Sequence, residues 1–169
     1  MERIAVIGSA GSGKSTLAIE LARITRLPLH HLDCIFWKPG WIEIPKNEFK
    51  LRQKEIIKSK NWIIDGNYSS TIDIRLETAD TIVFLDFSRY ICIWRVLKRI
   101  LLYRNRIRPD ITKGCYERIE MDFLKWVWNF PKRSRSLILE KLAYYRNSKN
   151  IIHLRHPREV KPFLNSLTS

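Results

Sequence analysis

The sequence has few cysteines and no long apolar run, and each absence excludes a class of protein. Cys34, Cys92 and Cys115 lie far apart and form no C-x-x-C pair, which argues against a zinc site and against a disulfide framework. No apolar stretch approaches the roughly 20 residues that span a bilayer, so we expect no membrane association. The N-terminal residues do not resemble a signal peptide, and we expect a cytoplasmic protein.

Linkers, internal repeats and low-complexity tracts are also missing, because the glycines and prolines are scattered along the chain. A chain of 169 residues with 45% hydrophobic residues is long enough to bury one sizeable core. We therefore expect residues 1–169 to form a single domain.

The positive charge is unevenly distributed along the chain. Residues 1–86 carry 12 Lys/Arg and 11 Asp/Glu, whereas residues 87–169 carry 19 and 6, a net of +13 out of a total of +14. A polyanionic ligand or partner is therefore expected to contact mainly the second half.

Five short apolar runs alternate with segments of helical periodicity, which is typical of a parallel sheet covered on both faces. The fold class we predict is α/β, a three-layer α/β/α P-loop NTPase domain with a five-stranded parallel sheet. In such sheets ligands bind at the carboxyl ends of the strands. The expected strands lie in the stretches RIAVIG, LPLHHLD, NWIIDGNY, TIVFLDF and KNIIHLRH.

Helices are expected in KSTLAIELARIT, in KNEFKLRQKEIIKSK and in the closing segment PREVKPFLNSL. The segment beginning at Arg89 is read as helix to about Arg106, and the segments around 110–130 and 132–147 are read as two further helices separated by Pro131. In the charged segment 46–60, the predicted inward residues are Phe49, Ile56 and Ile57.

The strongest motif is a phosphate-binding loop between the first strand and the first helix. It matches G-x-x-x-x-G-K-[ST] at every fixed position. Its glycines let successive backbone N–H groups face phosphate oxygens, Lys14 reaches the β- and γ-phosphates, and the Ser15 hydroxyl is a Mg²⁺ ligand. We expect ATP and Mg²⁺ as cofactors, with the nucleotide held by Gly8, Ser9, Ala10, Gly11, Ser12, Gly13, Lys14, Ser15 and Thr16.

Three aspartates follow strand-like runs at the same expected edge of the sheet. Asp65 is predicted to hold a magnesium-bound water, as a Walker B aspartate does. Asp33 is predicted either to do the same or to accept a proton from an acceptor hydroxyl. The alternative for both is a helix cap or a turn, and Asp86 is the weakest of the three because it also suits a helix cap.

Aromatic residues and histidines lie near these positions. Trp37 and Trp41 follow Asp33 in a Pro-Gly-containing loop, where they stack on a flat acceptor or, alternatively, pack a helix onto the sheet. His30 and His31 are interpreted as packed residues. Trp126 is expected to form a core face with Phe123 and Phe130.

The stretches GSAGSGKST, IIDGNYS and FLDFSRYICIWRVLKR resemble the adenylate-kinase-like branch of P-loop kinases. This resemblance implies that Gly66 borders the acceptor site. It also implies that Arg95 and Arg99, nine and thirteen residues after Asp86, contact the adenine and the phosphates. The Phe-Pro-Arg that follows Asp-Gly in adenylate kinases is absent here, and Arg75 is the candidate replacement for its arginine.

Over nearly its whole length the chain resembles the FlaR-like DNA topology modulation proteins. The stretches that carry this likeness are HLDCIFWKPGW, WIIDGNYSSTIDIRLETADTIVFLDFSR and RPDITKGCYERIEMDFLKWVWNF. The family name implies an effect on DNA, whereas the motifs resemble those of a small kinase.

The basic segment of about residues 88–130 is expected to form a helical lid over the donor. Its candidate phosphate-contacting residues are Arg95, Arg99, Arg104, Arg106 and Arg108. A lid does not require the whole positive excess, which also suits sequence-independent binding of DNA by the C-terminal half.

The function predicted is an ATP-dependent kinase that transfers the γ-phosphoryl group to a nucleotide or another small hydroxyl or phosphate acceptor. Lys14, Asp33, Asp65, Arg95 and Arg99 are the catalytic candidates. Asp33, Trp37, Gly66 and Arg75 are the substrate-binding candidates, and Ser15, Asp33 and Asp65 are the metal-binding candidates. Two alternatives stay open: a nucleotide-dependent DNA-associating protein, and a nucleotide-binding regulator without turnover.

Overall fold

The protein is described here from a computed structural model that covers residues 1–103 and 110–168. Along the chain its elements are β1 Arg3–Gly8, α1 Lys14–Thr25, β2 Leu29–His31, α2 Leu32–Phe36, β3 Trp37–Lys38, β4 Ile42–Glu43, α3 Lys46–Ile56, β5 Trp62–Asp65, α4 Ile72–Thr78, β6 Thr81–Leu85, α5 Arg89–Leu102, α6 Met121–Trp128, α7 Ser136–Tyr145, β7 Asn150–Leu154 and α8 Val160–Asn165. Short 3₁₀ turns occupy Ser69–Thr71 and Pro157–Glu159, and a π-helical turn occupies Pro131–Arg135.

The main sheet is parallel and contains the five predicted strands in the order β2-β5-β1-β6-β7. Its central strand, β1, pairs with β5 on one side and β6 on the other. Later strands of the chain therefore lie on both sides of β1, with β2 and β5 on one side and β6 and β7 on the other. The loop that follows β1 lies at this switch point. The prediction of a five-stranded α/β/α domain is confirmed.

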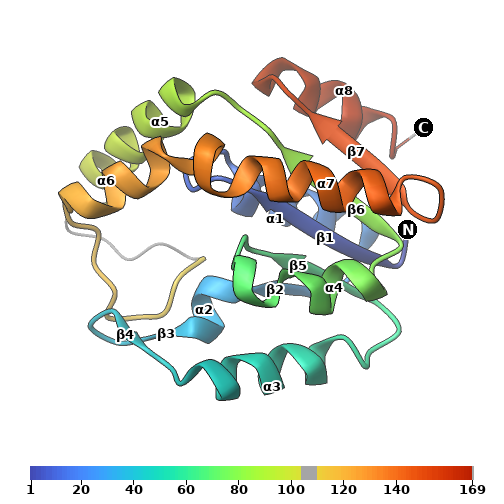
Figure 1. Ribbon diagram of the computed structural model, residues 1–169, viewed down its shortest axis with the longest axis horizontal. Helices are drawn as coiled ribbons and strands as arrows, with labels where there is room; N and C mark the ends of the chain where they lie inside the picture. The colour runs from blue at the N-terminus through green and yellow to red at the C-terminus, as the bar shows by residue number, and fades with distance from the viewer. Residues whose placement is uncertain (104–109, 169) are drawn as a thin grey trace.

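Alternating side chains of the strands form two cores, one on each face of the sheet. One core joins alternate strand residues such as Ile7, Ile64 and Phe84 to α3, α4 and α7. The other joins Val6, Ile63 and Val83 to α1, α5, α6 and α8. Figure 1 shows α7, α4 and α3 in front of the sheet and α1 behind it. The sheet is buried on both faces, which explains why its strands are continuous apolar runs.

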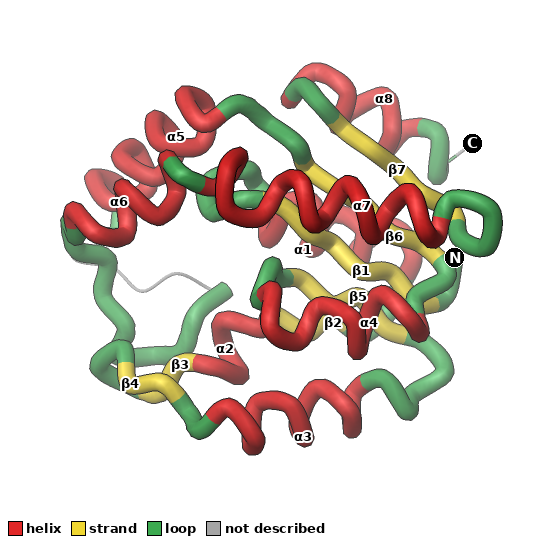
Figure 2. Tube along the Cα trace, viewed as in Figure 1, coloured by secondary structure: helices red, strands yellow, loops and turns green. Residues whose placement is uncertain are grey.

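Several elements extend beyond the carboxyl ends of the strands, where the phosphate loop also lies. In Figures 1 and 2 these are α5 and α6 on one side and the small β3–β4 hairpin on the other. The hairpin is antiparallel, with Trp37 opposite Glu43 and Lys38 opposite Ile42. Together these elements surround the carboxyl ends of the strands.

The helix predicted over about 110–130 is wrong for its first half, because only Met121–Trp128 is helical. Gly114 has a φ of 91°, which a right-handed helix does not allow. Its carbonyl accepts a hydrogen bond from the Gly40 amide (3.1 Å), and Thr112 Oγ1 donates to the Cys34 carbonyl (3.1 Å). Residues 110–117 therefore form a loop bonded to the hairpin region.

Two further differences concern shorter segments, and the inward residues predicted for α3 are confirmed. The basic helix ends at Leu102, before the expected Arg106. The sequence patterns did not predict α4, the helix over Ile72–Thr78. In α3, Phe49 is buried, and Ile56 and Ile57 pack against the core as predicted. No helix in the described residues is long and apolar enough to cross a membrane.

Candidate functional site

The phosphate loop connects β1 to α1 and curls beneath the N-terminus of that helix. Gly13 is the residue before the helix, with a left-handed φ of 95°, and Lys14 begins it. The amides of the first helical turn have no partners within the helix, so they and the helix dipole favour an anion at this end. The Lys14 ammonium donates to the Ser9 carbonyl (3.0 Å), which holds it over the loop.

Helix α5 packs directly on this loop. A Cβ atom added to Gly11, whose φ is 76°, would lie 2.3 Å from the Cys92 carbonyl oxygen and 2.9 Å from Val96 Cγ2. Only glycine fits this approach of loop and helix, so α5 fixes the shape of the loop.

Gly11→Ala is expected to weaken Mg-ATP binding and to lower the free energy of unfolding. Gly40→Ala is the matched control, because Gly40 has a similar φ of 80° but no atom within 4 Å of an added Cβ. Both variants place a Cβ atom on a left-handed backbone, which destabilises the fold. The free energy of unfolding should fall by about 1–3 kcal/mol more in Gly11→Ala, because its methyl overpacks the loop against α5. Urea unfolding and nucleotide titration measure the two effects. Equal losses in both variants would show that the contact with α5 does not shape the loop.

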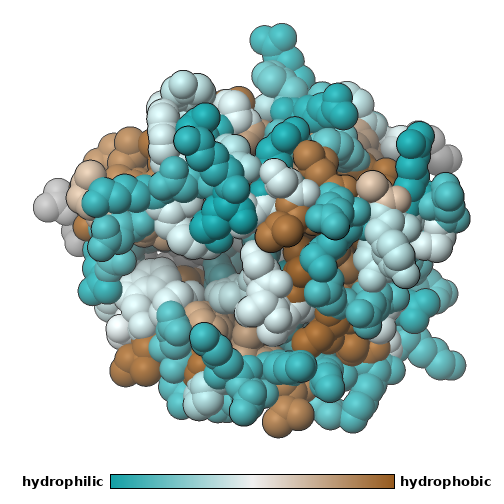
Figure 3. Space-filling view, viewed as in Figure 1, coloured by the Kyte–Doolittle hydropathy of each residue, from teal (hydrophilic) through white to brown (hydrophobic). Residues whose placement is uncertain are grey.

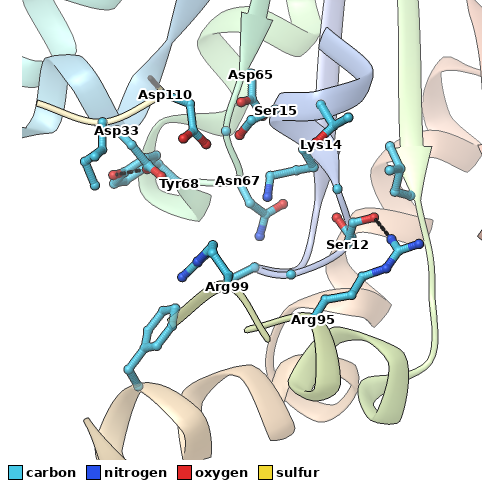
Figure 4. Close-up of a pocket in the computed structure, with 18 of the residues that line it drawn as sticks. Ser12, Lys14, Ser15, Asp33, Asp65, Asn67, Tyr68, Arg95, Arg99 and Asp110 are labelled. Atoms are coloured by element: carbon cyan, nitrogen blue, oxygen red, sulfur yellow. Dashed lines mark hydrogen bonds between the residues drawn. The ribbon is translucent and has the colours of Figure 1, made fainter. Parts of the chain in front are cut away.

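Two arginines of α5 reach the same region. Arg95 donates through Nη1 to the Ser12 carbonyl (2.8 Å) and lies over the Phe87 ring. Arg99 forms an ion pair with Glu117, with 3.0 Å between Nε and Oε1. In Figure 4 both arginines come from one side of the site, and Lys14 and Asn67 lie between them and the carboxylates.

Asp65 and His31 form a pair at the carboxyl ends of neighbouring strands. His31 Nδ1 lies 2.9 Å from Asp65 Oδ2, while Asp65 Oδ1 is buried without a hydrogen-bond partner. Burial lowers the pKa of His31, but the hydrogen bond to Asp65 and its charge outweigh this effect, so the pKa is raised. Asp65 is 4% exposed and lines the cavity, and its unpaired oxygen requires a proton donor or a cation.

Asp33 lies opposite the arginines. The sequence suggested that Asp33 lies at the end of a strand, but it does not. β2 ends at His31, and Asp33 is in the first turn of α2 because the fully buried Leu32 begins that helix. Asp33 Oδ1 accepts a hydrogen bond from the Tyr68 hydroxyl (2.7 Å). Burial and the neighbouring Asp33 charge raise the pKa of Tyr68, so the phenol stays protonated and donates.

These groups line one cavity of about 1250 Å³. The phosphate loop from Ala10 to Thr16, Arg95 and Arg99, and the carboxylates of Asp33, Asp65 and Asp110 all line it. In Figure 4, Asp65 lies beside Ser15 of the loop, and Asp33 lies beside Tyr68. The space-filling view shows the surface recessed between α6 and the β3–β4 hairpin (Figure 3). The cavity exceeds the usual volume of a single drug-sized site, and it has room for a nucleoside triphosphate beside a second small molecule.

No group of three or more His, Cys, Asp or Glu side chains in residues 1–103 and 110–168 is placed to hold a metal alone. Mg²⁺ is commonly held by one or two carboxylates together with substrate phosphates and waters. Ser15 at the start of α1 and the unpaired Asp65 Oδ1 fit such a site, in which phosphate oxygens complete the coordination.

Solved structures of several kinases resemble this chain over nearly its whole length. The TM-score is 0.56 to a gluconokinase from Sinorhizobium meliloti 1021, with 16% identity, 99% of this chain and 89% of that chain covered. It is also 0.56 to a shikimate kinase from Acinetobacter baumannii (15% identity; 99% and 90% covered), and 0.55 to a deoxyadenosine kinase from M. mycoides (13% identity; 99% and 100% covered). The chain has the P-loop kinase fold.

No protein-family model matches the sequence, and no curated protein matches it. The P-loop kinase fold is therefore shown by structure alone, and membership of the FlaR-like family stays a prediction.

Most of the predicted nucleotide-site residues line the cavity of this P-loop kinase fold. Gly8 and Ser9 are exceptions, because they form the base of the loop and do not line it. Trp37 and Gly66 also line the cavity. Arg104, Arg106 and Arg108 lie outside the described residues.

Arg75 is the clearest correction, because it does not line the cavity and cannot grip an acceptor there. Its side chain is 0% exposed, and it donates to the Gly66 carbonyl (2.9 Å), Gln53 Oε1 (3.1 Å) and the Thr71 carbonyl (3.2 Å). Burial lowers the pKa of Arg75 to about 10, so it remains charged at neutral pH. The arginine therefore ties α3, α4 and the Gly66 turn together beneath the site.

Arg75→Met is expected to lower the free energy of unfolding by about 3 kcal/mol. Methionine fills similar space but leaves the Gly66 carbonyl and Gln53 Oε1 without the Arg75 donor, and each costs about 1–3 kcal/mol. Arg146→Met is the matched control, because Arg146 is exposed after α7. Urea unfolding compares the two variants, and similar stabilities would refute the structural role of Arg75.

Asp86 also lies away from the cavity. It accepts two hydrogen bonds from Arg135 (2.7 and 2.8 Å) and lies 2.9 Å from His153 Nε2. Although burial opposes ionisation, the bonds from Arg135 and His153 lower the pKa of Asp86. Asp86 therefore links β6, β7 and the turn before α7.

Trp126 differs from its prediction as a core residue. It is 40% exposed, lines the cavity and lies beneath the Arg133 guanidinium, 4.1 Å from the ring centroid. Val127 and Phe130 supply the buried face instead. The fold turns α6 so that an aromatic residue and an arginine border the site.

Asn67, Tyr68 and Asp110 are among the cavity residues that were not identified from the sequence. Asn67 and Tyr68 directly follow Asp65-Gly66, so their proximity to that motif was the available signal. Asp110 was visible as the one acidic residue between Arg89 and Lys113, but its place depends on a loop that sequence periodicity does not describe.

Proposed function

We propose that the protein is an ATP-dependent phosphotransferase that moves the γ-phosphoryl group of ATP to a small acceptor. One observation carries this proposal. A single cavity joins a phosphate-binding loop, the neighbouring Asp65 and two arginines to a further carboxylate, Asp33. A molecule that only bound nucleotide would need the loop and Asp65 but not Asp33.

At the donor end, the loop amides and Lys14 bind the β- and γ-phosphates, and Arg95 and Arg99 face the transferred group. Phosphoryl transfer gains most of its acceleration from positioning and charge neutralisation, which these cations provide. Ser15 and Asp65 would hold Mg²⁺ together with the nucleotide, and the ion would supply charge neutralisation at the phosphates.

At the acceptor end, Asp33 is the proton acceptor. The acceptor oxygen forms a bond to the γ-phosphorus, the bond from that phosphorus to the β,γ-bridging oxygen breaks, and ADP leaves. The hydroxyl proton passes to the Asp33 carboxylate, which the Tyr68 hydroxyl holds in place. Proteins of similar fold include a gluconokinase, a shikimate kinase and a deoxyadenosine kinase, which supports a small-molecule acceptor.

The segment from about residue 88 to residue 130 acts in this proposal as a lid. Its loop bonds to the opposite hairpin through Gly114 and to α2 through Thr112, and Trp41 Nε1 donates to the Tyr116 carbonyl (2.9 Å). Contacts of this kind close the cavity over a bound nucleotide and exclude water that would otherwise hydrolyse it.

The test is ADP release from Mg-ATP with a panel of nucleosides, nucleoside monophosphates and small hydroxylated metabolites. The proposal predicts that at least one acceptor raises ADP release well above the rate with ATP alone, and that a phosphorylated product appears in equal amount. Tight Mg-ATP binding without stimulation by any acceptor would instead indicate a nucleotide-binding regulator.

The uneven charge favours a second candidate function, nucleotide-dependent association with DNA. Part of the excess is used within the fold, as in the ion pairs of Arg135 with Asp86 and of Lys141 with Asp73. A gel-shift titration over salt concentration tests whether the remaining positive charge binds DNA, since sequence-independent binding weakens steeply with salt. Absence of a shift at low salt would exclude this candidate.

A further inference from the structure

The strand pairing of the sheet brings His31 and Asp65 together. They are register partners in the parallel strands β2 and β5, and each is the last residue of its strand. Asp65 is also fixed from its other side, because Val6 of β1 is its register partner there and the Gly66 amide donates to the Val6 carbonyl (3.2 Å). The backbone of Asp65 is therefore held on both sides, and the rotation of its carboxyl group depends on what that group contacts.

The ring of His31 restricts that rotation. Its Nδ1 atom lies 2.9 Å from Asp65 Oδ2, and the two side chains are 14% and 5% exposed. An ionised carboxylate only accepts hydrogen bonds, so Nδ1–H is the donor, in a neutral ring as in a charged one. A bond to Oδ2 fixes the plane of the carboxyl group and thereby the direction in which the other oxygen, Oδ1, points.

The second oxygen of Asp65 belongs to the nucleotide end of the cavity. Asp65 lines the cavity and lies beside Ser15 of the phosphate loop in Figure 4. Within the described residues its buried Oδ1 has no hydrogen-bond partner, and a buried acceptor of this kind favours a cation or a donor from a ligand. His31 itself does not line the cavity. Asp65 therefore presents one oxygen to the site, and His31 contacts the other oxygen from behind.

A second histidine–aspartate pair in the protein shows what a purely structural pair contains. His153 Nε2 lies 2.9 Å from Asp86 Oδ2, and the two side chains are 21% and 6% exposed. Both oxygens of Asp86 accept further bonds, because Arg135 donates to Oδ1 (2.7 Å) and to Oδ2 (2.8 Å). Neither Asp86 nor His153 lines the cavity. The pair at Asp65 matches it in distance and burial, but leaves one carboxylate oxygen for the site.

We propose that His31 is a positioning residue for the metal site, which holds the carboxyl group of Asp65 so that Oδ1 is the oxygen available to Mg²⁺. This inference rests on the proposed phosphotransferase function for its metal, and it adds a residue from outside the cavity lining. A carboxylate that offers one oxygen suits Mg²⁺, which takes one or two carboxylates beside phosphates and waters in a strict octahedron. Loss of a partner that orients a metal-binding group lowers metal affinity by about ten- to a hundredfold.

The experiment measures how much Mg²⁺ strengthens nucleotide binding, which requires no turnover. Isothermal titration calorimetry gives the affinity for a non-hydrolysable ATP analogue with Mg²⁺ and again with EDTA, and we call the ratio of these affinities the magnesium gain. His31→Leu should lower the magnesium gain by on the order of tenfold, because the carboxyl group of Asp65 is no longer held. The affinity in EDTA should stay unchanged, because the phosphate loop is intact.

Two matched variants separate positioning from general stability. His31→Asn carries an N–H donor near the place of Nδ1 and should keep most of the magnesium gain. His153→Leu removes the ring from the other buried pair, so it should lower the free energy of unfolding and leave the magnesium gain unchanged. If His31→Leu does not fold, His31→Gln replaces it, because the longer side chain keeps the site polar but moves the donor away from Asp65 Oδ2.

A double-mutant cycle with Asp65→Asn tests whether His31 acts through Asp65. Asp65→Asn alone should lower the magnesium gain, because an amide oxygen is a weaker ligand for Mg²⁺ than a carboxylate. Adding His31→Leu to Asp65→Asn should lower the magnesium gain no further. Additive losses would show that His31 affects the nucleotide site by another route, and would overturn the inference.

The outcomes distinguish this inference from the function on which it rests. An undiminished magnesium gain in His31→Leu, or equal losses in His31→Leu and His153→Leu, would overturn the inference and leave the kinase function standing. The predicted pattern of magnesium gains, without phosphoryl transfer to any acceptor, would support the role of His31 and overturn the kinase function. Absence of a magnesium gain in the unaltered protein would overturn the metal site and the inference together.

Discussion

Lys14→Ala is expected to reduce ADP release by about a thousandfold or more while the protein remains folded. The Lys14 ammonium lies over the phosphate loop at the start of α1, where it reaches the β- and γ-phosphates. Removing one preorganised cation or donor at a reacting centre costs about a hundred- to a thousandfold, and Lys14 also contributes to nucleotide binding. Both kcat and the affinity for Mg-ATP should therefore fall.

Lys50→Ala is the matched control, because Lys50 is exposed on α3 and lies outside the cavity. Its ADP release and thermal unfolding should equal those of the unaltered protein. Thermal unfolding of Lys14→Ala should also be close to normal, since within the described residues the Lys14 ammonium donates one hydrogen bond, to the loop carbonyl of Ser9. Full activity in Lys14→Ala would remove the basis for assigning the loop to phosphate binding.

Asp33→Asn is expected to reduce kcat by roughly a hundred- to ten-thousandfold with little change in Mg-ATP binding. The amide preserves the shape of the side chain and can still accept the Tyr68 hydrogen bond, but it cannot take up the acceptor proton at neutral pH. The loss should fall on kcat, because the substitution affects the reacting hydroxyl and not the donor end.

Asp73→Asn controls for the removal of one carboxylate. Asp73 is an exposed residue of α4 paired with Lys141, and the loss of a surface pair costs about 1 kcal/mol or less. Single-turnover kinetics of both variants provide the comparison. If Asp33→Asn raises KM and leaves kcat intact, Asp33 binds the acceptor without accepting its proton.

The strands and the phosphate loop were predictable because local chemistry determines them. Buried parallel strands such as Arg3–Gly8 and Thr81–Leu85 are continuous apolar runs, and the loop needs its glycines and lysine at fixed positions. The order of strands around β1 then places Asp65 beside the loop. Spacing along one helix was likewise enough to bring Arg95 and Arg99 to the cavity.

The acceptor end was less predictable because contacts between distant segments build it. The turn at Gly114 is fixed by the hairpin at Gly40, and Trp41 is held by the Tyr116 carbonyl. Arg75 resembled a substrate-binding arginine by its distance from Asp65, yet its side chain points into the core toward Gln53. No local pattern distinguishes an arginine that lines a cavity from one that supports it from beneath.

The charge of the second half has more than one structural use. Arg95, Arg99 and Arg133 line the cavity, whereas Arg135 pairs with Asp86 and stabilises the fold. Net charge alone therefore did not distinguish a phosphate-binding site from a surface for nucleic acid.

Phosphorus NMR of the purified protein with Mg-ATP and a reactive acceptor tests the central claim most directly. The account predicts that the γ-phosphate signal of ATP disappears as ADP and a new phosphate monoester signal appear in equal amounts, and that Lys14→Ala prevents this change. Persistence of the ATP spectrum, or its conversion to ADP and inorganic phosphate alone, would contradict transfer to an acceptor within the cavity.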